Sequence, residues 1–333
     1  MPISILRIFR SQLGRLCGLL LGTALIATPA HASYPDHPIR MIIGLQPGGS
    51  TDVLARQIAS HLGTKDGWQL IIENRPGAAT RIGMEAMSRS AADGYTLAIA
   101  NAVSANFPMM FDDYTFKPGQ DFVPVSLLGR APSYIAIRAS LPVKNVKEFI
   151  EYVKANAGKI NYGHGSNGSN PHLAVRLLVQ SLGLQATEVA YKGNAPTALA
   201  LATGEIDFAI LDYPSVRPLV ERGSVRLIAV TEPKRAAMTP DIPTSTEQGL
   251  TPELEGVTPW FMLVAPAGTP EAVVSLLNEH FTEALKSPDV RDTALSLGIE
   301  PQGMNVSDSR SYFLEMRARA EELTRRLNIS MKN

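Results

Sequence analysis

Residues Ile39–Leu62, IRMIIGLQPGGSTDVLARQIASHL, decide the fold class because they contain a strand pattern, a loop and a helix pattern in succession. The run from Ile39 to Leu45 is apolar and rich in isoleucine, as expected of a buried strand. In the segment from Val53 to Leu62, leucine and isoleucine recur every four residues, which predicts a helix with one apolar stripe. The glycine-rich loop between them completes a βα unit.

The same alternation continues along the chain and predicts an α/β fold whose sheets are mostly parallel and flanked by helices. Asn170 is the expected N-cap of a helix that begins at Pro171, and Gly204 is the expected end of another helix. The remaining expected strands are 70–73, 96–100, 123–128, 134–137, 159–162, 188–191, 206–211 and 260–265. The remaining expected helices are 83–89, 146–155, 171–181, 195–202, 270–285, 290–297 and 309–327.

The first 32 residues have the pattern of a cleavable secretory signal peptide. Three arginines precede the apolar run Leu16–Ala27, and the small-x-small triplet Ala30-His31-Ala32 follows it. A membrane anchor is the alternative, but this run is shorter than the roughly 20 apolar residues that span a bilayer. Cys17 lacks the surroundings of a lipoprotein acceptor, so a lipid anchor is the weaker interpretation. We expect cleavage near Ala32 and a periplasmic protein.

The mature chain would keep 301 of the 333 residues and would contain no cysteine, because Cys17 is the only one. This excludes disulfides and any cysteine-based catalysis or metal binding. Loss of three arginines leaves 28 basic against 31 acidic residues, a net charge of −3. No nucleic-acid partner is indicated, and a chain of this length usually forms two domains.

In open α/β sheets, ligands bind beyond the carboxyl ends of the strands. Two glycine-rich loops occupy such positions, each directly before a helix. The first contributes Gly48, Gly49, Ser50, Thr51 and Asp52, and the second contributes Ser166, Asn167, Gly168, Ser169 and Asn170. Backbone N–H groups at a helix N-terminus suit a carboxylate or a phosphate, so an anion could be held without any arginine. Each loop alone could be an ordinary strand-to-helix turn, but their pairing favours a site between the two halves of the chain.

The polar residues of the first loop have alternative roles. Ser50 and Thr51 either donate to a ligand or cap the helix, and capping is the favoured role for each. Asp52 would repel an anion, so we expect it to support the loop by accepting hydrogen bonds from loop N–H groups.

Other kinds of site find less support in the sequence. Gly163–Gly168 matches the dinucleotide pattern GxGxxG, with Glu188 20 residues further on, but the preceding strand is short and polar. An exported protein would also rarely meet a dinucleotide. The five histidines that remain after cleavage lack metal-ligand spacing, and no GxSxG motif is present. We therefore expect no catalytic residues, no metal and no cofactor, and we expect Trp260 to pack near a hinge.

Seven segments together resemble the Bug family of periplasmic receptors, the substrate-binding components of tripartite tricarboxylate transporters. The resemblance covers essentially the whole mature chain. The segments are QPGGSTDVLAR (46–56), IIENRPGA (71–78), DGYTLAIAN (93–101), GKINYGHGSNGSNPHLA (158–174), VAYKGNAPTALALATGEIDFAI (189–210), VRLIAVTEPKR (225–235) and FMLVAPAGTPEAVV (261–274).

The resemblance implies a two-lobed clamshell of the periplasmic-binding-protein type II, with two crossover strands between the lobes. Residues 33–130 and 256–333 would form lobe 1, and residues 131–255 would form lobe 2. A small carboxylate ligand, namely a di- or tricarboxylate, an amino acid or an aromatic acid, would bind between the lobes. It would contact both glycine-rich loops, and Asn101, Ser104 and Asp212 would line the rest. The expected partner is a two-component membrane permease, and the expected state is a monomer.

Three places in the sequence, five residues in all, depart from the family pattern. A proline is expected where Gln46 stands, glycines and an asparagine where residues 79–81 stand, and a smaller residue where His164 stands. Gln46 and His164 flank the proposed pocket, so no particular ligand is carried over from the family. Two other functions stay open at this point: a sensor that presents its liganded form to a signalling partner, and an exported enzyme that acts on carboxylates.

Overall fold

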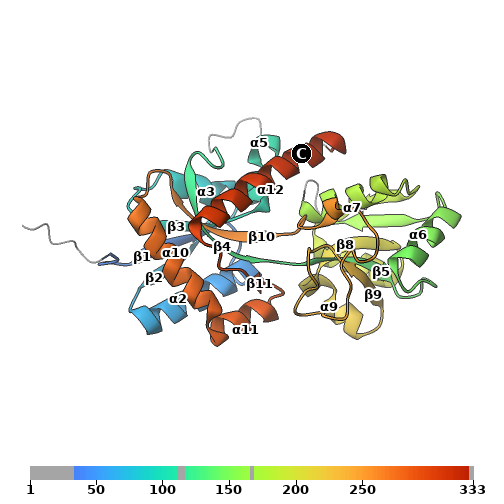
Figure 1. Ribbon diagram of the computed structural model, residues 1–333, viewed down its shortest axis with the longest axis horizontal. Helices are drawn as coiled ribbons and strands as arrows, with labels where there is room; N and C mark the ends of the chain where they lie inside the picture. Colours follow the sequence, from blue (N-terminus) through green and yellow to red (C-terminus); the bar gives the residue numbers. More distant parts are fainter. Residues whose placement is uncertain (1–33, 111–116, 166–168, 330–333) are drawn as a thin grey trace, which may run out of the picture. The chain divides into compact units, whose positions relative to one another are not determined.

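The computed structural model describes residues 34–110, 117–165 and 169–329, and the residues from His37 onward belong to one compact unit. The expected signal peptide, residues 1–32, lies entirely outside the described residues. Two β-sheets, each flanked by helices, form the architecture of this unit (Figure 1). No helix among the described residues is both long and apolar enough to cross a membrane.

The first sheet contains six strands and uses two distant parts of the chain. Strand β1 pairs in parallel with β2 and β3, whereas β10 pairs antiparallel with β3 and β4, and β11 pairs antiparallel with β4. In spatial order the strands are β11 (Glu300–Pro301), β4 (Phe122–Arg130), β10 (Trp260–Pro266), β3 (Thr96–Asn101), β1 (Ile39–Ile43) and β2 (Leu70–Asn74).

The second sheet contains five strands, all from the middle of the chain. Strand β6 pairs in parallel with β7 and β8, and β5 pairs antiparallel with β8 and β9. The strand order is β7 (Thr187–Ala190), β6 (Asn161–His164), β8 (Phe208–Asp212), β5 (Ser133–Arg138) and β9 (Val225–Val230). The prediction of mostly parallel sheets is confirmed, because most strands of each sheet run in one direction and only β10 and β11 in the first sheet and β5 in the second run the opposite way. Both sheets are mixed, because β4, β5, β9 and β10, which enter or leave the segments between the sheets, run antiparallel to a neighbour.

Helices cover both faces of each sheet, and alternate strand residues point to opposite faces. In β5, Ile135 and Ile137 pack in one apolar core with α6 and α7, whereas Tyr134 and Ala136 pack in another core with α8 and α9. The helices of this sheet are α6 (Val146–Ala155), α7 (Asn170–Ser181), α8 (Asn194–Thr203) and α9 (Tyr213–Glu221).

Around the first sheet, Met84 of α3 and Phe313 of α12 pack on one face. Helices α2, α10 and α11 are joined to one another by hydrogen bonds of His61 with Asp289 and of His280 with Asp66. The helices associated with this sheet are α2 (Ser50–Asp66), α3 (Arg81–Ser88), α4 (Ala102–Ala105), α5 (Phe107–Met110), α10 (Glu271–Lys286), α11 (Pro288–Ser296) and α12 (Val306–Arg326). Two short 3-10 helices are η1 (Ala78–Thr80) and η2 (Pro252–Leu254).

Two segments connect the sheets, and hydrogen bonds hold them side by side. The Ala131 N–H donates to the Pro259 carbonyl, and the Thr231 N–H donates to the Ser133 carbonyl. Helix α12 packs against both sheets. Phe313, in its first half, packs on the first sheet, and Leu323, in its last turn, packs in the core of the second sheet. The last helix therefore contacts the cores of both sheets.

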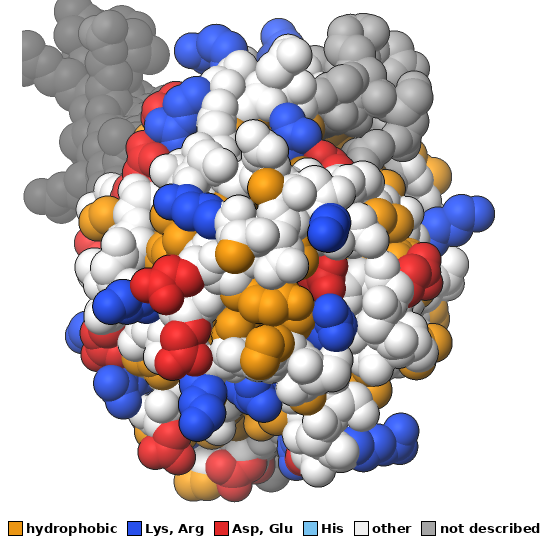
Figure 2. All heavy atoms as spheres, turned by 90° about the vertical axis from the view of Figure 1, so that its right-hand side faces the viewer, with side chains coloured by type: hydrophobic (Ala, Val, Ile, Leu, Met, Phe, Trp, Pro, Cys, Tyr) orange, Lys and Arg blue, Asp and Glu red, His pale blue; other side chains and the backbone are white. Residues whose placement is uncertain are grey.

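Figure 2 shows the face on the right-hand side of Figure 1, where acidic and basic side chains are interspersed around a small hydrophobic patch. No single sign of charge dominates this face. Mixed charge of this kind is typical of a solvated surface and gives no electrostatic footprint for a polyanion there.

Candidate ligand-binding site

A cavity of about 360 Å³ lies where several strands end and helices begin. This volume is within the range of small-molecule sites. Three of the predicted site residues, Asn101, Ser169 and Asn170, line it. The other lining residues are Ala102, Val103, Pro171, Gly193, Asn194, Ala195, Ser215, Pro259, Trp260 and Phe261.

Three helices of the second sheet present their first turns to this cavity. Asn170 is the first residue of α7, Asn194 is the first residue of α8, and Ser215 is the third residue of α9. The first N–H groups of a helix have no intrahelical acceptor and carry the positive end of the helix dipole. No side-chain cap bond is made at the start of α8, whose N-cap is Gly193. The start of α8 thus offers the cavity N–H groups that no side chain caps, whereas the first turns of α7 and α9 each have a side-chain cap; the lining residues include no lysine or arginine.

Strand β3 contributes Asn101 through a capping box at the start of α4. The Asn101 Oδ1 accepts from the Ser104 N–H at 3.1 Å, and the Ser104 Oγ accepts from the Asn101 N–H at 3.3 Å. Because the amide oxygen of Asn101 is used in this cap, its Nδ2 is the group that could donate into the cavity. Ser104 itself is completely buried and also contacts the Thr80 hydroxyl, so its side chain supports Asn101 and does not line the cavity.

Asp212 also lies behind the cavity wall and holds two lining residues in place. Its Oδ1 accepts from the Ser215 N–H at 3.0 Å as the N-cap of α9, and its Oδ2 accepts from the Asn194 Nδ2. Asn194 and Ser215 were not singled out from the sequence. Asn194 lies three residues after the predicted strand 188–191 and Ser215 lies four residues after the predicted strand 206–211, so a longer window after each strand would have found them.

The second predicted loop lies only partly within the described residues, since Ser166, Asn167 and Gly168 fall outside them. Ser169, and not Asn170, is the N-cap of α7: the Ser169 Oγ accepts from the His172 N–H. Asn170 instead donates its Nδ2 to the Thr258 carbonyl in the segment that leads to β10. The predicted cap was wrong because the Asn170 side chain is engaged by a residue 88 positions away.

The first predicted loop is not part of the cavity lining. Gly49 is the N-cap of α2 and makes no side-chain cap bond, so the favoured capping role of Ser50 and Thr51 is wrong. Gly48 and Gly49 are exposed and Thr51 is buried. The expected supporting role of Asp52 is confirmed, because its Oδ2 accepts from the Gly48 N–H at 2.9 Å.

Asp52 is buried and its charge is compensated by several donors. Arg56 donates to both carboxylate oxygens, from Nε at 3.0 Å and from Nη2 at 2.9 Å, and the Asn74 Nδ2 donates at 3.0 Å. The hydrogen bond from Arg56, with those from Gly48 and Asn74, outweighs burial and lowers the pKa of Asp52 to about 2. Asp52 therefore anchors the loop as an ionised carboxylate at neutral pH.

Trp260 combines the predicted packing role with a place at the cavity. Its side chain is buried, and its ring meets those of Tyr312 and Phe313 edge to face at 6.3 and 6.2 Å. As the first residue of β10, it follows the segment between the sheets. Trp260 thus joins one wall of the cavity to the core under α12.

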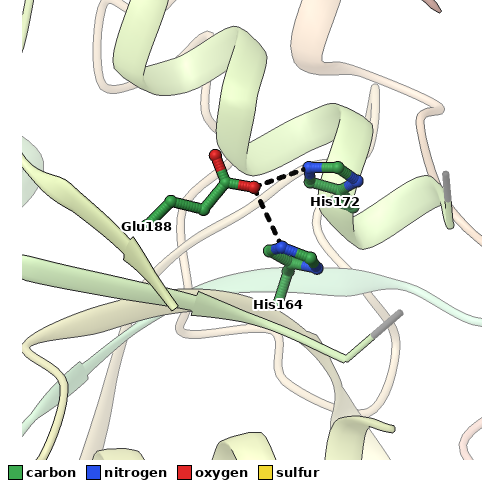
Figure 3. Close-up of side chains that lie close together, drawn as sticks. All are labelled: His164, His172 and Glu188. Atoms are coloured by element: carbon green, nitrogen blue, oxygen red, sulfur yellow. Dashed lines mark hydrogen bonds and ion pairs between the residues drawn. The ribbon is translucent and has the colours of Figure 1, made fainter. Parts of the chain in front are cut away.

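A second group of polar residues lies next to the cavity and was not predicted as a site. Within the described residues, His164, His172 and Glu188 place their ligand atoms within 4.8 Å of one another (Figure 3). No sequence motif indicates this group, because the two histidines are eight residues apart and the third residue lies on another strand. The dinucleotide interpretation of Glu188 also loses its basis, since this carboxylate is bonded to His172, Arg176 and Tyr162.

The two helix-flanked sheets and the cavity define the class of the protein as a two-lobed α/β binding protein of the clamshell type. The family model for the tripartite tricarboxylate transporter family receptor matches residues 54–329, and the chain belongs to this family. Protein BugT of Bordetella pertussis (strain Tohama I) is 33% identical over 304 residues, which cover 90% of this chain and 92% of BugT. The chain is thus a Bug-type periplasmic binding protein.

Two solved structures of relatives contain carboxylates. The R. palustris protein Rpa4515 with adipate is 31% identical, with a TM-score of 0.74 over 90% of this chain and all of that chain. MatC from Rhodopseudomonas palustris with bound malate is 29% identical, with a TM-score of 0.68 over 87% of this chain and 99% of that chain. The family and the fold are those of substrate-binding proteins and not of enzymes.

Proposed function

We propose that this protein captures a small carboxylate in the cavity at the starts of α7, α8 and α9 and delivers it to a two-component membrane permease. One observation carries the proposal: the first turns of three helices line one cavity whose lining residues include no lysine or arginine. Backbone N–H groups at helix N-termini bind carboxylates without a cationic side chain. The adipate and malate in the two relatives support the same class of ligand.

The cavity also favours a ligand with a short apolar body between or beside its carboxylates. Pro171, Ala195, Pro259 and Phe261 line it together with the amide and hydroxyl groups. Such a surface would pack against methylene groups or a small ring, while the helix starts receive the charged end. Dicarboxylates of four to six carbons and aromatic acids meet this description.

Ligand binding would be coupled to closure about the two connecting segments. The residues of the cavity come from both parts of the chain, since Asn101 and Trp260 belong to the first sheet and Asn194 and Ser215 follow strands of the second. A ligand that contacts both sets favours the closed arrangement by its differential affinity. The closed, liganded form would be the one that the permease recognises in the periplasm, after export by the N-terminal signal peptide and cleavage near Ala32.

A thermal-shift screen of the purified mature protein tests this function. Di- and tricarboxylates, amino acids and aromatic acids are compared with neutral sugars and with the amides of the same acids. A ligand at 100 times its dissociation constant should stabilise the protein by about 2.7 kcal/mol. Stabilisation by sugars or amides alone would contradict the proposal. Loss of uptake of the identified acid on gene deletion would separate transport from sensing.

A further inference from the structure

His164, His172 and Glu188 form a compact cluster, called here the His-His-Glu cluster, on three regular elements of the second sheet. His164 is the last residue of β6, His172 is the third residue of α7, and Glu188 is the second residue of β7. Strands β6 and β7 are parallel neighbours, and Tyr162 of β6 is paired with Glu188. The fold itself therefore brings these side chains together, because none of the three depends on a loop for its position.

The donor atoms of the cluster converge on one point. The Nε2 atoms of His164 and His172 lie 2.9 and 3.0 Å from the same carboxylate oxygen, Oε1 of Glu188. The two imidazole rings are stacked, with centroids 3.9 Å apart and planes inclined by 14°. Figure 3 shows both rings turning a nitrogen toward this oxygen. A small positive ion between the three atoms would be attracted by all of them.

The geometry points to a binding site for a divalent first-row transition metal ion, held by His164, His172 and Glu188, for which we propose zinc as the probe. Two imidazole nitrogens and one carboxylate oxygen form a known ligand set for zinc, with a fourth position left for water. Bonds of about 2.0–2.1 Å in a tetrahedral arrangement place the ligand atoms roughly 3.3 Å apart. The two nitrogen–oxygen distances would lengthen by a few tenths of an ångström, and the stacked rings, whose planes are inclined by only 14°, would tilt so that both nitrogens face the ion.

The other oxygen of Glu188 is fixed by residues outside the cluster. The Arg176 Nη1 donates to Oε2 at 2.6 Å, and the Tyr162 hydroxyl donates to the same oxygen at 2.8 Å. Such contacts orient a metal-binding carboxylate and leave its second oxygen directed at the ion. The positive charge of Arg176 opposes a cation, so we expect affinity in the micromolar range and weaker than that of a four-ligand structural zinc site.

The position of the cluster determines how a metal ion would enter and which elements a bound ion would join. His164 and His172 are buried, but the Glu188 side chain is 28% exposed and offers a path for the ion. A bound ion would join β6, β7 and the first turn of α7, next to the cavity residues Ser169 and Asn170. Metal binding does not require a small carboxylate to be bound in the cavity, so its test is independent of the proposed function.

The test is a calorimetric titration of the full mature chain with zinc chloride after removal of metals with a chelator. We expect one zinc ion per chain, and at least roughly 100-fold weaker binding in His172→Asn and in Glu188→Gln, each of which removes one of three ligands. Tyr162→Phe should weaken binding by about tenfold, because it frees the carboxylate without removing a ligand. Cobalt(II) should give the visible absorption bands of a tetrahedral site in the wild type.

The matched control changes His61 and His280 to asparagine, since these histidines pair with Asp289 and Asp66 on other helices. Zinc binding should be unchanged in this control. Absence of micromolar binding to the wild type would overturn the proposal, as would undiminished binding in both cluster variants. If the two cluster variants do not fold, the wild-type titration, the cobalt spectrum and Tyr162→Phe still decide the outcome.

Discussion

Replacement of Asp52 by asparagine should destabilise the protein in a way that depends on pH. The variant keeps the shape of the side chain but loses the charge that accepts from Gly48, Arg56 and Asn74. The pKa of Asp52 falls from 3.8 to about 2 on folding. At about 1.36 kcal/mol per pKa unit this corresponds to roughly 2 kcal/mol. Because the Arg56 side chain is half-exposed, solvent screening reduces the expected loss to about 1–2 kcal/mol.

The sign of the pH dependence follows from the lowered pKa. An acid whose pKa is lower in the folded state contributes stability above its unfolded pKa, and this contribution is lost as the pH falls through the folded pKa. The difference between wild type and Asp52→Asn should therefore be constant from pH 5 to 8 and should shrink between pH 4 and about 2.

Urea unfolding at pH 7, 5, 4 and 3.5 measures this difference, with the exposed residue Asp241 changed to asparagine as the control. The control should stay close to the wild type at pH 7. An equal loss for Asp52→Asn at every pH, or no loss at pH 7, would refute the ionised anchor described for the first glycine-rich loop.

Two further substitutions test the wall of the cavity and the segments between the sheets. Gly165→Ala would place a Cβ 2.6 Å from the Asn194 backbone nitrogen, so we expect a loss of about 1–3 kcal/mol and loss of carboxylate binding, whereas Gly63→Ala on α2 should be neutral or stabilising. Normal binding by Gly165→Ala would contradict the close approach of the two backbones. Burial raises the pKa of Glu232 although the Arg130 Nη2 lies 3.0 Å away, and Arg130→Met should raise that pKa further. Since an acid with a raised folded pKa loses its stabilising contribution as the pH rises, the variant should lose more stability at pH 8 than at pH 5 in urea unfolding, and equal losses would argue against the pairing.

The sequence predicted most of the regular elements because their apolar patterns are local. The helix 146–155 was predicted with the bounds of α6, and Gly204 ends α8 in a left-handed conformation as expected. Helix α9 and strand β9 were not predicted. Helix α9 contains Pro214 and Pro218, which are typical of helix ends, so local propensity conceals it. The antiparallel direction of β5 and β10 could not be predicted from the local sequence pattern either, since strand pairing depends on segments far apart in the chain.

For the site, the strand-end argument pointed to the region of the proposed cavity but to only some of the residues that line it. Asn101, Ser169 and Asn170 line the cavity, whereas Asp212 and Ser104 lie behind the wall as helix caps. A sequence shows that a polar residue follows a strand but not whether its side chain faces the ligand or its own backbone.

The His-His-Glu cluster could not be found from the sequence for a different reason. Its members come from two parallel strands and a helix, and their convergence depends on strand register. Ligand spacing along the chain detects only metal sites whose ligands share a short segment or one helix face.

The central claim is that the starts of three helices bind a carboxylate, and calorimetry with the best acid from the screen tests it most directly. The acid is compared with its amide on the wild type and on Asn194→Ala, whose altered side chain lies at the start of α8. We predict at least about tenfold weaker binding, or 1.4 kcal/mol, for the amide, and a smaller loss for the variant, which keeps the backbone N–H groups of α8. Equal affinity of acid and amide would contradict the claim.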